Sequence, residues 1–109
     1  VWSWGVGGEG RLGHGDEQSQ LLPKKVETFT GQRVVAVSAG REHSLATTAD
    51  GAVFTWGRGE YGILGHGEDL LDQLLPKKIE AFAGQRVLAT SAGAFRSFAV
   101  SPDGDVFTW

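Results

Sequence analysis

Residues 53–67 have the sequence Val-Phe-Thr-Trp-Gly-Arg-Gly-Glu-Tyr-Gly-Ile-Leu-Gly-His-Gly, and residues 1–15 have the sequence Val-Trp-Ser-Trp-Gly-Val-Gly-Gly-Glu-Gly-Arg-Leu-Gly-His-Gly. The two stretches share Trp-Gly and Leu-Gly-His-Gly at the same spacing. Self-similarity at a fixed period of about 20–50 residues is typical of repeat proteins. The fold of this chain therefore depends on what one repeat forms and on how neighbouring repeats stack.

The similarity extends over almost the whole chain. Residues 20–52 align with residues 73–105 after one inserted residue near Leu71 and Asp72, and more than half of the aligned pairs are identical. We therefore interpret residues 1–109 as a fragment of one propeller domain. The first repeat is 1–52, the second is 53–105, and a third begins at 106–109.

Each repeat is expected to form four short strands. The chain contains 17 glycines in 109 residues, which implies many tight turns. The expected strands are 34–39, 44–48, 53–56 and 77–82. Asp50-Gly51 is typical of a hairpin turn, and Pro76 before the last strand favours a sheet edge, where a missing N–H costs little. Four strands in about 50 residues form a propeller blade, so the sequence predicts an all-β propeller with about two four-stranded blades present.

The tryptophans belong to the third strand of this pattern. Trp4, Trp56 and Trp109 occupy one repeat position, and Trp2 occupies the position of Phe54. A middle strand of a blade packs against neighbouring blades on both faces. We therefore expect all four tryptophans to be buried.

Several of these motifs together resemble a known repeat. Val-Phe-Thr-Trp-Gly, Leu-Gly-His-Gly, Leu-Pro-Lys-Lys-Ile, Ser-Ala-Gly and Ser-Pro-Asp-Gly are similar to the regulator-of-chromosome-condensation repeat over essentially the whole chain. The resemblance implies a seven-bladed ring, completed by further blades of the same chain or by copies of it. Because two blades leave apolar outer faces and strand edges open, we expect the isolated segment to self-associate or to remain poorly folded.

One loop differs between the two repeats although the scaffold before it is constant. Identical Ser-Ala-Gly triplets precede residues 41–43 in the first repeat and residues 94–96 in the second. Such loops lie on one face of a propeller, and arginine and aromatic residues are enriched at interface hot spots. The candidate partner-binding residues are therefore Arg41, Glu42, His43, Phe95 and Arg96. The alternative is a variable loop without a binding role.

Two motifs could suggest a bound cofactor or metal. Residues 5–10 and 57–62 both match Gly-x-Gly-x-x-Gly, but Leu-Gly-His-Gly follows where a dinucleotide site needs a helix. His14 and His66 occur once per repeat, without the further ligands that a metal site needs. We expect the glycines to form turns and the histidines to make loop hydrogen bonds, with no cofactor and no metal.

A catalytic triad is also not expected. Ser44 lies within a predicted strand without an exposed elbow, and the hairpin turn explains Asp50, so His43 next to them does not indicate a hydrolase. The sequence therefore predicts no catalytic residue.

Composition narrows the class of partner. The formal net charge is −3, so no nucleic-acid partner is expected. No apolar run has the length of a membrane span, and the absence of cysteine suits a reducing compartment, so we expect an intracellular protein of the cytoplasm or nucleus. We predict a protein–protein interaction scaffold or adaptor rather than an enzyme. The resemblance leaves open a guanine-nucleotide exchange factor for a small GTPase, a regulatory propeller of a ubiquitin ligase and a structural propeller of a large assembly.

Overall fold

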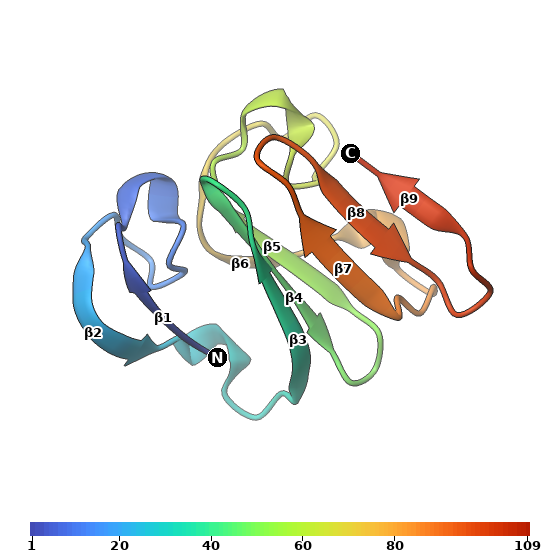
Figure 1. Cartoon of the computed structure of the whole chain (residues 1–109), viewed down its shortest axis with the longest axis horizontal. Coiled ribbons are helices and arrows are strands. Elements are labelled where there is room, and N and C mark those ends of the chain that lie inside the picture. The colour runs from blue at the N-terminus through green and yellow to red at the C-terminus, as the bar shows by residue number, and fades with distance from the viewer.

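The computed structural model describes all residues 1–109 as three antiparallel sheets arranged side by side (Figure 1). The strands are β1 (Trp2–Gly5), β2 (Gln20–Lys25), β3 (Val34–Ala39), β4 (His43–Thr48), β5 (Val53–Gly57), β6 (Gln73–Lys78), β7 (Ala89–Ala92), β8 (Ser97–Val100) and β9 (Val106–Thr108). The sheets contain β1-β2, β3-β4-β5-β6 and β7-β8-β9, so within each sheet every strand pairs with its neighbours in sequence. The predicted all-β propeller architecture of four-stranded blades is confirmed.

The remaining regular elements are 3-10 turns of three residues each. They are η1 (Gly8–Gly10), η2 (Glu27–Phe29), η3 (Glu60–Gly62) and η4 (Glu80–Phe82). No helix has the length and apolar character needed to cross a membrane.

The four-stranded middle sheet combines halves of both sequence repeats. Strands β3 and β4 come from the first repeat, and β5 and β6 come from the second. The hairpin between β4 and β5 closes through a hydrogen bond from Gly51 N to Thr48 O (2.9 Å), and Gly51 has a φ of 88°. Glycine adopts this left-handed conformation without the steric cost that a side chain adds. The predicted Asp-Gly turn therefore joins the two repeats within one sheet.

The last strand of the blade lies earlier than predicted. We expected a strand at residues 77–82, but β6 ends at Lys78 and the 3-10 turn η4 follows. The edge position of β6 tolerates Pro76 inside the strand. Ile79 and Phe82 are three residues apart, so one 3-10 turn brings both side chains to the core, which an extended strand would not do.

The same apolar contact is built twice, once between each pair of neighbouring sheets. Between the first two sheets, Phe29 packs edge-on against Phe54 and also meets Trp56, with ring centroids 5.3 Å and 5.8 Å apart. Between the second and third sheets, Phe82 makes the equivalent contacts with Phe107 and Trp109, both at 5.5 Å. Aromatic pairs in this geometry add to the free energy gained by burial. The repeated core is therefore an inter-blade core.

Burial of the tryptophans depends on whether a preceding sheet covers them. Trp56 is 2% exposed between the first and second sheets, as predicted. Trp2 and Trp4 are 61% and 58% exposed, so the prediction that they are buried is wrong for this structure. The elements that cover Trp56 come from the preceding repeat, and residues 1–109 contain no repeat before Trp4. The predicted self-association of the isolated segment stays a prediction.

The second and third sheets meet where β7 packs against both β3 and β4. Ser38 Oγ accepts a hydrogen bond from Ala92 N (2.9 Å). Thr47 Oγ1 on β4 lies 3.2 Å from Thr90 Oγ1 on β7. The small side chains of the Ser-Ala-Gly segments allow this close approach, and it fixes the ends of the β3–β4 and β7–β8 turns relative to each other.

Candidate partner-binding surface

Two equivalent turns, between β3 and β4 and between β7 and β8, lie at the upper ends of these strands in Figure 1. Gly40 N donates to His43 O (2.8 Å) in the turn between β3 and β4. Gly93 N donates to Arg96 O (2.8 Å) in the turn between β7 and β8. The backbone scaffold of the two turns is therefore the same, while the side chains that it presents differ.

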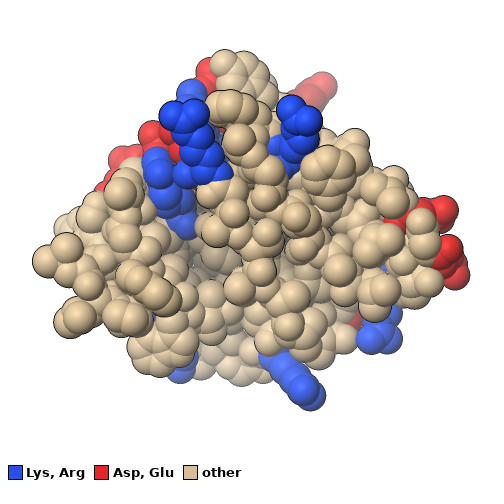
Figure 2. Space-filling model, in the orientation of Figure 1, with Lys and Arg blue, Asp and Glu red and all other residues tan.

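The structure brings the side chains of these two turns into contact. Arg41, Phe95 and Arg96 are exposed, and the guanidinium carbon of Arg41 lies 5.9 Å from the centroid of the Phe95 ring. A guanidinium over an aromatic face at this distance is attracted by the quadrupole of the ring. Figure 2 shows Lys and Arg side chains gathered along the upper edge of the molecule, over these turns. Two predicted loops thus form one continuous surface.

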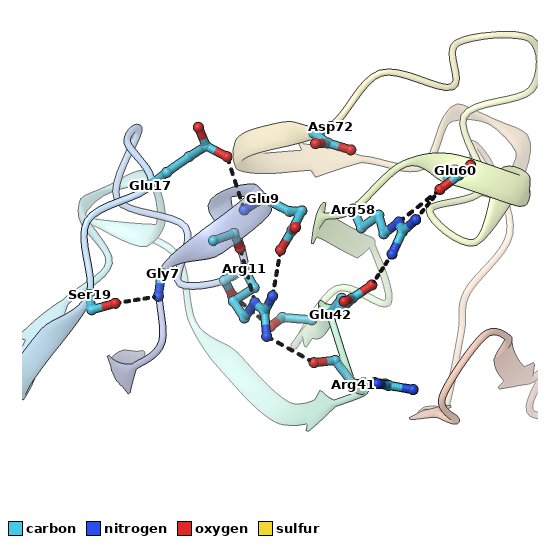
Figure 3. Close-up of polar contacts among 12 residues, drawn as sticks. Gly7, Glu9, Arg11, Glu17, Ser19, Arg41, Glu42, Arg58, Glu60 and Asp72 are labelled. Atoms are coloured by element: carbon cyan, nitrogen blue, oxygen red, sulfur yellow. Dashed lines mark hydrogen bonds and ion pairs between the residues drawn. The ribbon is translucent and has the colours of Figure 1, made fainter.

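Arg11 fixes the first of these turns from the neighbouring sheet (Figure 3). Its Nε donates to Gly8 O (2.9 Å), its Nη1 donates to Arg41 O (3.2 Å), and its Nη2 pairs with the carboxylate of Glu9. The planar guanidinium presents its donors in a rigid fork, so three simultaneous contacts hold it in one orientation. Arg11 therefore ties the backbone that carries Arg41 to the loop after β1.

Arg58 pairs with two carboxylates beside the same turn (Figure 3). Its Nη1 pairs with Glu42, and its Nε and Nη2 donate to Glu60. The hydrogen bond from Arg58 lowers the pKa of Glu42 below its ordinary value, and the carboxylates of Glu42 and Glu60 raise the pKa of Arg58. Glu42 is therefore ionised and engaged within the protein at neutral pH.

Arginines on this surface fall into two groups. Arg11 and Arg58 form ion pairs with carboxylates, whereas Arg41 and Arg96 form none. Surface ion pairs contribute little to stability, but they decide which charges remain available to a partner. The unpaired guanidinium groups lie in the loops whose contents differ between the repeats.

His43 does not belong to the accessible surface, and the prediction that it is a partner-binding residue of the loop needs correction on this point. It is 1% exposed, and its Nε2 lies 3.1 Å from Ser97 Oγ on the third sheet. Ser97 Oγ donates to Ile63 O (2.9 Å), so it accepts from the Nε2–H of His43. Burial lowers the pKa of His43, which keeps the ring neutral. His43 therefore joins two sheets.

The residues of the possible triad do not come together, because His43 and Ser44 begin β4 and Asp50 lies beyond its other end. His43 begins β4 and Asp50 follows its other end, where Asp50 accepts a hydrogen bond from Thr48. Ser44 Oγ donates to Arg11 O (2.9 Å), and Ser97 Oγ makes the equivalent hydrogen bond to Ile63 O in the next repeat. Each residue has a structural role in the described fold.

The glycine-rich stretches form compact loops with close backbone contacts. At Gly7 a Cβ would overlap the backbone carbonyl of Gln18, and at Gly59 it would overlap that of Leu71. The turns η1 and η3 occupy the place where a dinucleotide site would need a helix. The glycines therefore allow the two segments of each loop to pack backbone against backbone.

The loop histidines make one hydrogen-bond pattern in both repeats. Thr55 Oγ1 donates to Leu64 O (2.6 Å) and lies 2.9 Å from His66 Nε2, from which it accepts. Ser3 and His14 repeat the contact at 2.9 Å. No group of three or more metal-binding side chains is present. The predicted hydrogen-bonding role of these histidines is confirmed.

Lowering the pH from 7.5 to 5.5 is expected to reduce the free energy of unfolding. Burial lowers the pKa of His43 and of His66 below the ordinary value of 6.5, so below that pH the unfolded chain binds more protons than the folded one. The stability from each neutral ring is complete above pH 6.5 and is lost by at most about 1.4 kcal/mol per pH unit below it. Urea unfolding at pH 7.5, 6.5 and 5.5 measures this, and His43→Gln should flatten the dependence. Stability that stays constant or rises at pH 5.5 would contradict the prediction.

Sequence reasoning missed Arg11 and Arg58 as parts of this surface. Arg11 stands where the second repeat has Ile63, and Arg58 stands where the first has Val6. A charged residue in one repeat against an apolar residue in the other is the same signal that identified residues 41–43. Applied to the loops after β1 and β5, it would have identified both arginines.

Comparisons with known proteins agree with the repeated architecture. A model of the regulator of chromosome condensation (RCC1) repeat matches residues 1–47 and 50–100, and a second model of that repeat matches residues 34–63. The whole chain is 41% identical to the E3 ubiquitin-protein ligase HERC2 of Homo sapiens and 43% identical to the ultraviolet-B receptor UVR8 of Arabidopsis thaliana. It spans 2% and 24% of those two proteins.

Solved structures show the same fold. Human WBSCR16 superposes with a TM-score of 0.90 at 30% identity, over 100% of this chain and 28% of that one. Yeast RCC1 (Prp20), solved with Kap60, superposes with a TM-score of 0.87 at 24% identity, over 99% of this chain and 27% of that one. A crystal structure of Prp20p from Saccharomyces cerevisiae, reported with its binding to Gsp1p and histones, gives a TM-score of 0.85.

Proposed function

This chain belongs to the regulator of chromosome condensation (RCC1) repeat family, and we propose that its repeats act as a protein–protein interaction scaffold or adaptor within a propeller. Relatives built from the same repeat support a propeller interaction module as the general class. The binding surface in this proposal is the end of the blades that carries Arg41, Phe95 and Arg96, with Glu42 at its border. We also propose that repeats 1–52 and 53–105 are units of a larger closed ring.

The observation that carries the proposal is the contact between two variable turns on a constant scaffold. Arg41 and Phe95 come from turns with the same closing hydrogen bond, and they meet at 5.9 Å. Rigid strands hold both turns, so the side chains are presented to a partner without a large loss of conformational entropy. A surface of arginine and aromatic side chains has the composition of interface hot spots.

Protein partners are also what the related structures suggest. Yeast Prp20p is described with Gsp1p, with histones and with Kap60, all of which are proteins. A guanine-nucleotide exchange factor for a small GTPase remains the second candidate because of these structures. Nucleotide release from a panel of small GTPases, measured with and without the intact protein, distinguishes the two functions. A regulatory propeller of a ubiquitin ligase is a third candidate, suggested by HERC2.

A photo-crosslinking amino acid at position 95 is expected to capture the partner, whereas the same amino acid at Ala49 is not. Phe95 and Ala49 are both exposed but lie at opposite ends of the blades, since Ala49 follows β4 where Arg41 precedes it. Arg41→Ala should reduce the yield from position 95 about tenfold, which corresponds to a typical hot-spot loss. Mass spectrometry of cross-linked products in cells measures both yields.

Stability separates a binding role from a structural one. Arg41 and Phe95 are exposed, so Arg41→Ala should leave the free energy of unfolding within about 0.5 kcal/mol of the native value. Equal capture from positions 95 and 49, or capture that does not depend on Arg41, would exclude this surface as the binding site.

A further inference from the structure

Arg41 is an exposed cation that its own carboxylate neighbour does not neutralise. Glu42 follows it directly in sequence, yet the carboxylate of Glu42 pairs with Arg58 from the loop after β5. Arg58 also engages Glu60, so both acids beside the turn are occupied. The guanidinium of Arg41 lies over Phe95 with no carboxylate in ion-pair distance.

The geometry leaves one cation and one aromatic ring side by side for a ligand. Phe95 is 49% exposed even with Arg41 above its ring. Arg41 is held through its backbone, where its carbonyl oxygen accepts from Arg11 Nη1 at 3.2 Å, and its guanidinium forms no ion pair. A planar guanidinium prefers carboxylates, which it binds with two parallel hydrogen bonds. The ring beside it favours an apolar side chain.

We propose that Arg41 and Phe95 bind a segment of a protein partner that carries carboxylates beside an apolar residue, and that Arg58 keeps Arg41 available by pairing with Glu42. The proposal rests on the proposed function of this surface and specifies the chemistry of its partner. Arg41 and Phe95 contact the segment, whereas Arg58 is a positioning residue that acts through Glu42. Arg96 is exposed on the same surface, but the cation–π contact with Phe95 is made by Arg41.

Overall charge favours a peptide over a nucleic acid as the occupant. The chain has a formal net charge of −3, whereas nucleic-acid-binding proteins carry a basic excess over a wide face. Attraction of an acidic segment is therefore local and should be screened within a Debye length of about 10 Å at 0.1 M salt.

The test uses the intact protein and a fluorescein-labelled peptide of glutamate, leucine and glycine residues, with a matched peptide in which glutamine replaces every glutamate. Fluorescence anisotropy at low salt should show binding of the acidic peptide and at least about tenfold weaker binding of the glutamine peptide. Arg41→Gln should weaken binding of the acidic peptide about tenfold. Arg33→Gln, which removes the same charge from an exposed position at the other end of β3, should leave binding unchanged.

A single and a double variant test the role of Arg58 separately. Arg58→Gln should weaken binding of the acidic peptide about fivefold, because Glu42 is then free to pair with Arg41. The double variant Arg58→Gln with Glu42→Gln should restore binding, which a merely unfolded loop would not do. Thermal unfolding of each variant confirms that the fold is retained. Failure of the double variant to restore binding would overturn the role of Arg58.

Other outcomes overturn the partner chemistry without touching the proposed function. Equal affinity for the glutamine peptide, or equal loss with Arg33→Gln, would exclude an acidic segment while crosslinks from position 95 still stand. Tighter, Arg41-dependent binding of a single-stranded oligonucleotide of the same length would replace the peptide by a nucleic acid. Crosslinks that arise only from position 49 would exclude this surface as the partner-binding site, whether or not the acidic peptide binds.

Discussion

Trp56→Ala is expected to lower the free energy of unfolding by about 3–5 kcal/mol, the usual cost of truncating a large buried aromatic side chain. The indole is 2% exposed and packs on Phe29, with Val26 and Ala46 in the same cluster. Gly13 closes the site, since a Cβ there would lie 2.8 Å from Trp56 Nε1. The neighbours belong to two different sheets, so a collapse that fills the cavity would separate strands.

Urea unfolding of the intact protein, followed by circular dichroism, measures the loss. Phe95→Ala is the matched control, because it removes an aromatic ring that is exposed and should cost no more than about 1 kcal/mol. If Trp56→Ala stays within 1 kcal/mol of the native protein, the inter-blade core cannot be what holds the sheets together.

Gly57→Ala is expected to destabilise the protein by about 3 kcal/mol or more, although it adds one methyl group. Gly57 has a φ of 105°, which L side chains rarely adopt, and such strain costs about 1–3 kcal/mol. A Cβ at this position would also lie 2.5 Å from Glu42 O and 2.9 Å from His43 Cα. Both are backbone atoms, so relief requires movement of β5 against the turn that carries Arg41.

Gly31→Ala separates the two contributions. Gly31 has a φ of 82° but a Cβ there meets nothing within 4 Å, so only the conformational strain remains, about 1 kcal/mol. Chemical unfolding of both variants gives the difference, which we assign to the backbone overlap. Equal losses at positions 57 and 31 would contradict the close approach. Binding of the acidic peptide should also weaken in Gly57→Ala, because the turn would shift.

Much of the fold follows from local patterns in the sequence, because local chemistry decides those elements. Asp50-Gly51 predicted the hairpin between β4 and β5, since a turn of that backbone shape needs glycine. Ile79 and Phe82 are three residues apart, which is the period of a 3-10 turn and not of a strand, so our interpretation of residues 77–82 as a strand overlooked this signal.

What the sequence could not supply is the set of contacts between repeats. Trp4 and Trp56 share one motif, yet only Trp56 has a preceding sheet to cover it. His43 lies in a variable loop, and its burial depends on Ser97 in the following repeat. Part of the candidate surface was predicted, since Arg41 and Phe95 do meet. The pairing of Arg58 with Glu42 was not, because it joins different loops.

The sharing of one sheet between two sequence repeats has a consequence for the order in which the chain folds during synthesis. The sheet that begins at Val34 is complete only at Lys78, when the fourth strand has emerged. At roughly 5–20 residues per second, β3 and β4 wait a few seconds on the ribosome for β5 and β6. Because Trp56 on β5 packs on Phe29 in the turn η2 that follows the preceding sheet, arrival of each new repeat both completes one blade and attaches it to its predecessor. Assembly should therefore advance from the N-terminus in overlapping steps, each closing the edge that the previous step left open.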